Sequence, residues 1–228
     1  MLQEWLIKPH VLLYVDMKTS YSAREIEFLK TLPKHYTDRL IIKECPLGEY
    51  ERENKYLPYR NLILGTLAMQ YGQHVYFGFN DCDDAPDKDK TFLNRTTKLF
   101  EHLNKNCIYD MGWETDNFGF SAPFKNYSKT EMVRICLDEG MPVDLIQNIR
   151  SCYSGTSEKG CGECYVCLNK AVALLNNGIY DPKVFDHEFT IEDFDNRIKF
   201  IEEGPYEYKT KYYQEVKRAR KHLLKLQK

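Results

Sequence analysis

Hydrophobic and polar positions alternate along this chain in short blocks, and three blocks have the character of strands. The apolar run at residues 11–17 is rich in β-forming side chains, and similar runs follow at 40–42 and 74–80. A strand covered on both faces is apolar along its whole length, whereas a half-exposed strand alternates. The three runs therefore predict buried strands of a parallel sheet.

Helical spacing separates these strands. The first helix is predicted to begin at Ser20 or Ser22 and to run through Leu32, because Pro33 stops it. Ser128 and Glu131 have the spacing of a capping box, which predicts a helix start at that point. Further helices are predicted near residues 61–69, 91–105 and 168–175. Strands that alternate with helices indicate an α/β fold with a parallel sheet.

The C-terminal stretch differs in pattern from the rest. Residues 179–206 are acidic and aromatic, without a recognisable catalytic pattern. From Lys209 onward a helix is predicted, because apolar side chains recur at helical spacing on one stripe. The stripe consists of Tyr212, Val216, Ala219, Leu223 and Leu226. The opposite face of this helix is basic.

Four of the eight cysteines fall within sixteen residues, spaced C-x8-C-x2-C-x2-C. They are Cys152, Cys161, Cys164 and Cys167. Each two-residue gap forms a tight knuckle whose backbone amides can point at a thiolate, and Gly160 and Gly162 supply the conformational freedom for it. Four thiolates suit a tetrahedral, structural Zn²⁺. A disulfide framework and an iron–sulfur cluster remain as alternatives.

Composition restricts the class of protein. The 228 residues are 43% hydrophobic and 14% aromatic, which is enough for a core and excludes disorder of the whole chain. The apolar runs are short, and residues 1–20 lack a signal-peptide pattern, so we expect a protein without a membrane span. The other cysteines are scattered singly, as is typical of a reducing cytoplasm, and we therefore expect a cytoplasmic location.

Charge is distributed unevenly. The net charge of −2 argues against a nucleic-acid footprint over the whole surface. Residues 209–228, however, carry eight Lys and Arg against one Glu, which leaves 24 basic and 33 acidic residues elsewhere. The basic tail either docks on an acidic body or contacts nucleic acid.

Polar residues gather where the predicted strands end and helices begin. Arg60 and Asn61 open a helix, and a run of aspartates follows the strand at 74–80. Such side chains could hold Mg²⁺ or hydrogen-bond a ligand, since ligands bind at the carboxyl ends of parallel strands. A helix cap and a solvated acidic loop are the alternatives. Lys129, at the first helical position after Ser128, could face a ligand or solvent.

Four segments together resemble the 7-cyano-7-deazaguanine synthase family of queuosine-precursor biosynthesis. Residues 56–61 resemble its aromatic/Val-Pro-x-Arg-Asn segment, and residues 78–83 resemble its Gly-x-Asn-x-x-Asp. Pro123 with residues 128–133 is similar to its Pro…Ser-Lys-x-Glu-Ile-Val. The stretch from Ser151 through Cys167 matches its Ser-Cys-Tyr…Cys-Gly-x-Cys-x-x-Cys zinc motif, the most specific of the four. The resemblance covers roughly residues 11–177.

The resemblance implies an adenine-nucleotide α-hydrolase-like (Rossmann-like) α/β domain over residues 1–178, with a four-cysteine zinc knuckle at 151–168. Residues 179–228 would be a helical C-terminal extension. The implied substrate-binding residues are Arg60, Asn61, Asn80, Asp83 and Asp87. Lys129 is the implied catalytic candidate.

Two departures from the family pattern concern ATP. Family members carry Ser-Gly-Gly-x-Asp-Ser after their first strand, and this motif is absent from the 228 residues. The strand at 11–17 corresponds to the second family strand, so the ATP loop is expected to be missing. Residues 18–22 offer hydroxyls, but no glycine, as a substitute phosphate site. The family's Tyr-Pro-Asp-Cys-Arg reads Ala-Pro-Asp-Lys-Asp at 85–89.

The family reaction converts 7-carboxy-7-deazaguanine to the amide and nitrile with ATP and ammonia. Three interpretations compete: an enzyme of this type, alone or with a partner chain that supplies the ATP loop; a non-catalytic base-binding or scaffold paralogue; and a zinc-stabilised nucleic-acid-binding module. The expected cofactor is structural Zn²⁺, with ATP and Mg²⁺ in question because of the missing loop. The sequence does not decide whether the protein forms a homodimer, or whether its product is used to modify tRNA or DNA.

Overall fold

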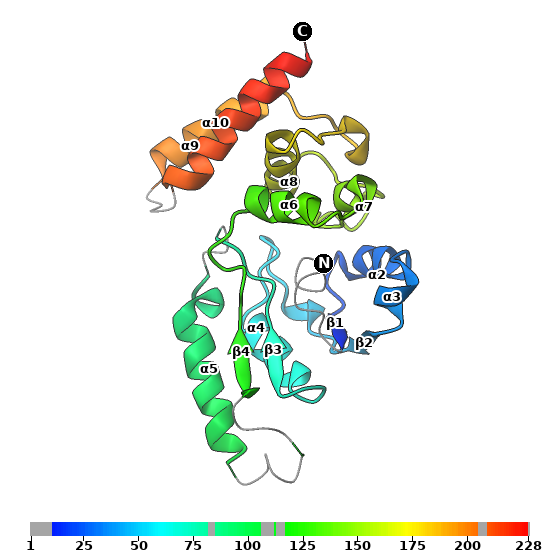
Figure 1. Ribbon diagram of the computed structural model, residues 1–228, viewed down its shortest axis with the longest axis vertical. Coiled ribbons are helices and arrows are strands. Elements are labelled where there is room, and N and C mark those ends of the chain that lie inside the picture. Colours follow the sequence, from blue (N-terminus) through cyan, green and yellow to red (C-terminus); the bar gives the residue numbers. More distant parts are fainter. Residues whose placement is uncertain (1–10, 82–84, 106–111, 113–116, 205–208, 228) are drawn as a thin grey trace. The chain divides into compact units, whose positions relative to one another are not determined.

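The computed structural model describes residues 11–81, 85–105, 112, 117–204 and 209–227 (Figure 1). The chain divides into two compact units. Of the described residues, those at 11–19 and between Pro33 and Asn126 belong to the first unit, and those between Ser20 and Leu32 and from Tyr127 onward belong to the second. The chain therefore leaves the first unit after its first strand, contributes one helix to the second, and returns.

Two pairs of parallel strands form the sheet structure described in the first unit. β1 (Leu12–Asp16) pairs with β2 (Leu40–Glu44), with Leu12 opposite Leu40. β3 (His74–Tyr76) pairs with β4 (Gly119–Ser121). The predicted strands at 11–17 and 40–42 are confirmed. The strand predicted at 74–80 is shorter, because the ladder to β4 ends after the Phe77 amide donates to the carbonyl of Ser121 at 2.8 Å.

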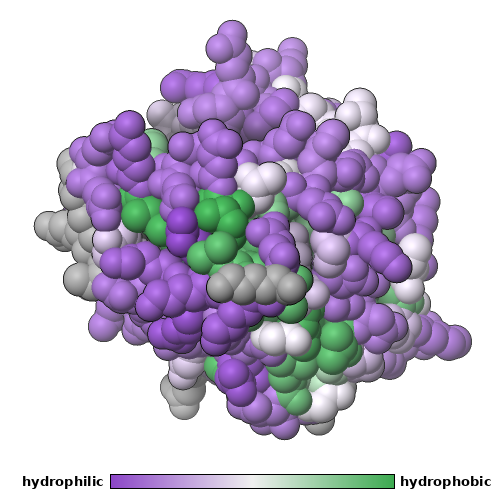
Figure 2. Space-filling view, turned by 90° about the horizontal axis from the view of Figure 1, so that it is seen from above, coloured by the Kyte–Doolittle hydropathy of each residue, from purple (hydrophilic) through white to green (hydrophobic). Residues whose placement is uncertain are grey.

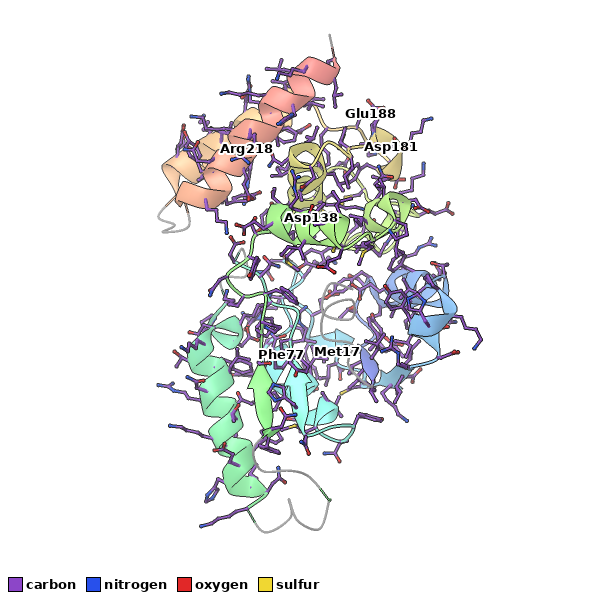
Figure 3. All side chains as sticks on the ribbon, viewed as in Figure 1. Met17, Phe77, Asp138, Asp181, Glu188 and Arg218 are labelled. Atoms are coloured by element: carbon purple, nitrogen blue, oxygen red, sulfur yellow. The ribbon has the colours of Figure 1, made fainter. Side chains whose placement is uncertain are left out.

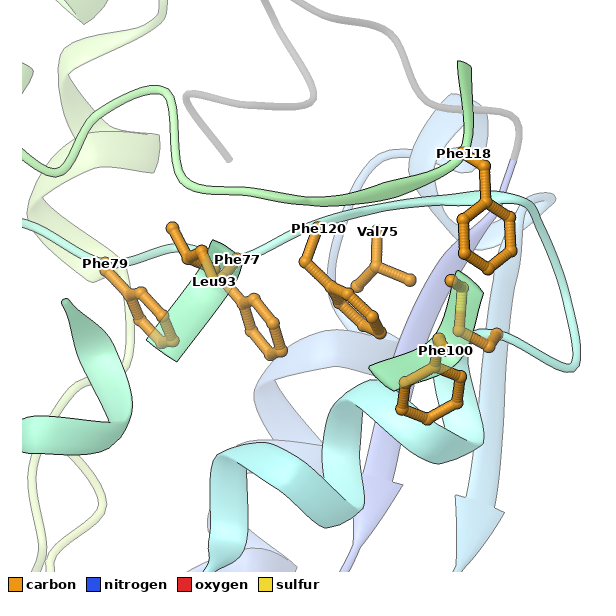
Figure 4. Close-up of a cluster of buried hydrophobic side chains, with 8 residues drawn as sticks. Val75, Phe77, Phe79, Leu93, Phe100, Phe118 and Phe120 are labelled. Atoms are coloured by element: carbon orange, nitrogen blue, oxygen red, sulfur yellow. The ribbon is translucent and has the colours of Figure 1, made fainter. Parts of the chain in front are cut away.

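Aromatic packing forms the main core of the first unit. α4 (Arg60–Ala68) and α5 (Lys90–Leu103) contribute to it together with β3 and β4. Figure 4 shows its members, which are Met69, Val75, Phe77, Phe79, Leu93, Phe100, Phe118 and Phe120. Gly65 on α4 lets the helix approach the rings, because a Cβ there would lie 2.9 Å from Phe120. A second cluster of buried side chains consists of Val15 on β1, Met17 and Leu57.

Helices make up most of the second unit. They are α2 (Ser22–Lys30), α6 (Lys129–Asp138), α7 (Val143–Asn148), α8 (Tyr165–Asn176), α9 (Ile191–Glu203) and α10 (Lys209–Leu226). α8 is the central one, since it packs against both α6 and α10, and its residues 171–175 are at most 2% exposed. α10 also packs along α9, as Figure 1 shows.

Short helices complete the described elements. They are α3 (Lys34–Thr37) and the 3-10 turns η1 (Gly48–Tyr50), η2 (Pro86–Lys88) and η4 (Pro182–Val184). η2 packs against both α4 and α5.

Several predicted details of the helices are wrong. Neither Ser20 nor Ser22 caps α2: the cap position is Tyr21, which makes no capping hydrogen bond with its side chain, and Ser22 is buried in the first turn. Leu226 lies on the predicted apolar stripe of α10 but is 65% exposed, because the helix outruns its packing partners. The capping box at Ser128 is confirmed, with Lys129 as the first helical residue.

Hydrogen bonds fix α10 to the rest of the second unit. The buried hydroxyl of Ser128 donates to the buried carboxylate of Glu215 at 2.5 Å. The side chain of Asn176 donates to the Glu215 carbonyl at 3.0 Å, and the Tyr212 hydroxyl donates to Asn169 on α8. A carboxyl group so deep in the unit is tolerated because Ser128 hydrogen-bonds to it. α10 is thus an integral part of this unit.

The face shown in Figure 2 is mostly hydrophilic, with smaller hydrophobic patches between the polar side chains. Among the described helices, none combines the length and the hydropathy that a bilayer crossing requires.

Candidate metal centre

The four clustered cysteines bring their sulfur atoms together in the second unit. All four Sγ atoms lie within 4.8 Å of one another, and those of Cys161 and Cys167 are 3.9 Å apart. A tetrahedral zinc site with Zn–S distances of about 2.3 Å has S–S edges of about 3.8 Å. Cys152 and Cys167 are buried, and the other two are half-buried. The donor set and its spacing therefore fit a metal ion such as zinc.

Backbone amides point at the sulfur atoms, as the knuckle spacing predicted. The amides of Ser154 and Cys161 both donate to Cys152 Sγ at 3.3 Å. The Cys164 amide donates to Cys161 Sγ at 3.3 Å, and the Cys167 amide donates to Cys164 Sγ at 3.4 Å. The last contact is also the N-cap of α8. Donors aimed at sulfur stabilise the thiolate form that a metal requires.

Two glycines permit this geometry, for different reasons. Gly162 has φ +77°, and a Cβ there would lie 1.8 Å from the carbonyl oxygen of His187. Gly160 has no such backbone requirement; a Cβ on it would meet the Phe185 ring at 2.8 Å and Cys167 Sγ at 3.1 Å. The predicted need for conformational freedom is therefore confirmed at Gly162, while Gly160 serves close packing.

Two arginines hold the eight-residue loop between Cys152 and Cys161. Arg24 of α2 donates to the carbonyls of Gly155 and Thr156 at 3.3 and 3.4 Å. Arg150 donates to two carbonyls farther along the same loop, those of Ser157 and Lys159. The loop is thus tied at several points, which keeps the first cysteine close to the other three.

Without a metal, the sulfur atoms share protons unequally. The hydrogen bond from Cys167 lowers the pKa of Cys164 to about 4. The same bond, together with burial, raises the pKa of Cys167 above its usual range, and burial raises the pKa of Cys161. Because neighbouring thiolates repel one another, only a cation can hold all four deprotonated, and metal binding must release protons.

A segment distant in sequence packs beside the cluster. Gly160 forms a parallel bridge with Phe185: its amide donates to the Val184 carbonyl at 3.1 Å, and its carbonyl accepts from the Asp186 amide at 2.7 Å. Sequence reasoning missed this role of residues 184–187. Only the aromatic character of Phe185 hinted at burial, since the contact itself is long-range.

A cavity of 270 Å³ adjoins the cluster within the second unit. Its walls include Arg24, Phe28, Arg150, Cys152, Cys167 and Lys170. Lys170 donates to the Ile149 carbonyl at 3.0 Å, and burial lowers its pKa to about 8, an effect that the nearby Cys167 sulfur opposes. Lys170 therefore places an amine beside the sulfur atoms, in a space large enough for a small molecule.

The predicted base-binding residues that the structure describes lie in the first unit. Arg60 and the buried Asn61 open α4, and α4 packs against η2, which contains Asp87. The buried Asn80 follows β3, and its carbonyl accepts from the side chain of Lys125 at 3.2 Å. Lys125 had no sequence signal of its own. The assignment of these side chains to a base-binding site stays a prediction.

The other two predicted residues are placed differently. Asp83 lies outside the described residues. Lys129 opens α6 in the second unit, where it is half-buried. Its catalytic role stays a prediction.

Residues 18–22 are the candidate substitute phosphate site, and the surroundings of Lys18 argue against this role. Lys18 Nζ lies 2.6 Å from the carboxylate of Asp16 and 2.7 Å from that of Glu44. Hydrogen bonds to these two carboxylates raise the pKa of Lys18. Two carboxylates beside one ammonium leave a net negative charge, which disfavours a triphosphate.

Comparison with known families agrees with the cysteine motif. The family model described as "Queuosine biosynthesis protein QueC" matches residues 15–178. The chain belongs to the QueC family. The predicted fold class is thereby confirmed: an adenine-nucleotide α-hydrolase-like, mixed α/β fold with parallel strands, a helical C-terminal region and a cysteine cluster able to bind a metal.

Relatives named 7-cyano-7-deazaguanine synthase share moderate identity with this QueC-family chain. The Leptospira biflexa protein is 28% identical over 141 residues, which is 59% of this chain and 54% of the relative. The Archaeoglobus fulgidus protein is 29% identical over 171 residues, or 71% and 64% of the two chains. The Rickettsia akari protein is 22% identical over 190 residues, or 80% and 77%. The Leptospira alignment thus spans about half of that relative's length.

Proposed function

We propose that this QueC-family chain binds a 7-deazaguanine base and takes part in converting 7-carboxy-7-deazaguanine to its amide and nitrile. The observation that carries the proposal is the convergence of four cysteine sulfurs within 4.8 Å, at the end of a 164-residue segment that matches the QueC family from 15 to 178. The name of the relatives, 7-cyano-7-deazaguanine synthase, suggests the reaction, and the described residues include candidates for metal binding and base binding.

The metal in this proposal is Zn²⁺, in a structural role. Four protein ligands complete a tetrahedron and leave no position for substrate, so the ion holds the 151–167 loop against α8. Elemental analysis of the purified protein should give one zinc per chain. Stoichiometric iron with a visible absorption spectrum would instead identify an iron–sulfur cluster and contradict this assignment.

The base in this proposal binds in the first unit, near the start of α4. A guanine-like edge presents N–H donors, which a carboxylate such as Asp87 can accept, and a carbonyl, which Arg60 or an amide such as Asn61 can bind. Leaving one partner of such a pair unsatisfied costs about 1–3 kcal/mol. Asp87→Ala should therefore weaken base binding by about fivefold to 150-fold, measured by titration calorimetry.

Asp38→Ala is a matched control for that substitution, because Asp38 is an exposed carboxylate of the same unit that pairs only locally with Lys34 at 2.7 Å. It should leave the affinity unchanged. Equal losses from the two substitutions, or no loss from Asp87→Ala, would show that Asp87 does not contact the base.

The activation step requires ATP. A carboxylate oxygen of the base attacks the α-phosphate and pyrophosphate leaves; ammonia then displaces AMP to give the amide. A second ATP adenylates the amide oxygen with release of pyrophosphate, and loss of AMP, which carries that oxygen, and of the protons on the amide nitrogen gives the nitrile. Such a step depends on donors that converge on the phosphates. The 228 residues contain no Ser-Gly-Gly-x-Asp-Ser, so we propose that the phosphate-binding loop comes from outside them, for example from a partner chain.

Measuring AMP release with the carboxylated base, ATP and ammonia tests this division. The 228-residue chain should bind the base but release no AMP until a loop-bearing polypeptide is added. AMP release by the chain alone would overturn the proposed need for an external loop. A non-catalytic base-binding role is the second candidate, favoured by the two carboxylates around Lys18; it predicts base binding without AMP release under either condition.

A further inference from the structure

α10 presents a row of positive charges on the side opposite its buried stripe. With about 100° of rotation per residue, Lys217, Arg218, Lys221 and Lys225 fall within an arc of about 100°. The buried residues Tyr212, Val216, Ala219 and Leu223 occupy the opposite side of the same helix. All four basic side chains are exposed, and Figure 3 labels Arg218 on α10.

Four acidic residues on or near this helix are paired with groups other than Arg218, Lys221 and Lys225. Glu215, the one acidic residue of α10, is buried and bound by Ser128. Asp195 of α9 pairs with Arg220, and Glu131 pairs with Lys211. Glu202 accepts from the Tyr213 hydroxyl, which in turn accepts from Lys217 at 3.4 Å. Within the described part of the chain, no ion pair neutralises Arg218, Lys221 or Lys225, so their charges face solvent.

We propose that this basic face of α10, formed by Lys217, Arg218, Lys221 and Lys225, binds the phosphodiester backbone of a nucleic acid. From Lys217 to Lys225 the helix rises about 12 Å. The same length of duplex carries about seven phosphates, so each cation can reach one. We expect these cations to contact phosphate oxygens, and contacts to phosphate carry no sequence information, so the proposed binding is independent of sequence. This inference does not rest on the proposed base chemistry.

An anionic membrane would offer similar charges, but the structure disfavours it. A helix that lies on a bilayer buries its own apolar face among the lipids. Apart from Leu226, the apolar stripe of α10 is already buried against α8 and α9, with Val216 and Ala219 fully inaccessible. What remains exposed is the charged face, which suits a hydrated phosphate backbone better than a lipid interface.

Fluorescence anisotropy with labelled 20-nucleotide single-stranded RNA, single-stranded DNA and duplex DNA tests the proposal on the full 228-residue chain. The logarithm of the association constant should fall with that of salt concentration with a slope of about −3, as expected for three to four phosphate contacts. Arg218→Gln/Lys221→Gln/Lys225→Gln together should weaken binding at least tenfold at low salt and bring the slope to about −1, because Lys217 remains. Comparison of the three probes identifies the preferred nucleic acid.

A matched triple variant on α5 controls for total charge. Lys90→Gln/Arg95→Gln/Lys98→Gln also removes two lysines and one arginine, here from exposed positions of α5 in the first unit. It should bind as the unmodified chain does. Equal weakening by the two triples, no measurable binding to any of the three probes, or binding to phosphatidylserine vesicles but not to nucleic acid would overturn the proposal. Circular dichroism should show unchanged helicity for both.

Discussion

Gly162 offers a sharp test of how the metal loop is built. Its φ of +77° is a conformation that side chains with a Cβ rarely adopt, and its α-carbon lies against the backbone of His187. Gly162→Ala should therefore impose two costs: strain in the left-handed region and displacement of the chain at His187. Because Cys161 and Cys164 flank this glycine, the displacement should also disturb the metal ligands.

The two costs can be separated with Gly178. Gly178 has a similar φ of +70°, but a Cβ on it would meet nothing within 4 Å. Gly178→Ala should therefore cost only the left-handed strain, about 1–2 kcal/mol. At Gly162 the added Cβ would lie 1.8 Å from an oxygen, so the backbone must move by about 1 Å or more. We expect a total loss of at least about 3 kcal/mol, in the range of large single-site effects.

Urea unfolding of both variants gives the two free energies, and chelator competition gives their zinc affinities. Gly162→Ala should lose more stability than Gly178→Ala and should also lose zinc affinity at least tenfold, whereas Gly178→Ala should bind zinc normally. If the two variants lose equal stability and both keep full zinc affinity, the close approach of residues 162 and 187 has no energetic role, and the reasoning fails.

Two further substitutions probe the cluster and the capping box. Cys161→Ser should remove stoichiometric zinc and lower the unfolding midpoint more than Cys45→Ser, a half-buried cysteine outside the cluster; equal effects on both measurements would contradict a metal site. Burial raises the pKa of Glu131, but hydrogen bonds from Lys211 and Ser128 outweigh it and lower the pKa below 4.5. The ionised carboxylate therefore stabilises the fold above pH 4.5, and this stabilisation is lost as the pH falls through the lowered pKa. Glu131→Gln should therefore cost about 1 kcal/mol at pH 7 and much less near pH 3, while Glu139→Gln should cost little at either pH; a loss independent of pH would refute the assignment.

Local signals accounted for what the sequence predicted correctly. The continuous apolar runs gave β1 and β2, the Ser128–Glu131 pair gave the start of α6, and the cysteine spacing gave the metal cluster. α9 was missed although Thr190 and Asp193 form a capping box, because the acidic and aromatic composition of this stretch concealed its helical period.

Contacts between distant segments were beyond the reach of such signals. The bridge from Gly160 to Phe185 and the bond from Ser128 to Glu215 join residues that no spacing rule connects. β4 is only three residues long and begins at Gly119, whose φ of +138° is unusual for a strand, so its sequence gave no strand pattern. Its identity depends on pairing with β3, which is a tertiary contact.

Because α10 packs on α8, the segment that matches the family ends earlier in the chain than the unit that folds together. The family match stops at residue 178, two residues after α8 ends, yet α8 is covered by α10. A protein shortened at residue 178 would expose the apolar side of the helix that begins at the metal cluster, and would leave Ser128 without its carboxylate. Residues 179–228, which lie beyond the family-model match, are therefore expected to be required for a stable, metal-competent fold, and an exchange of segments between members of the family should move them together with α8.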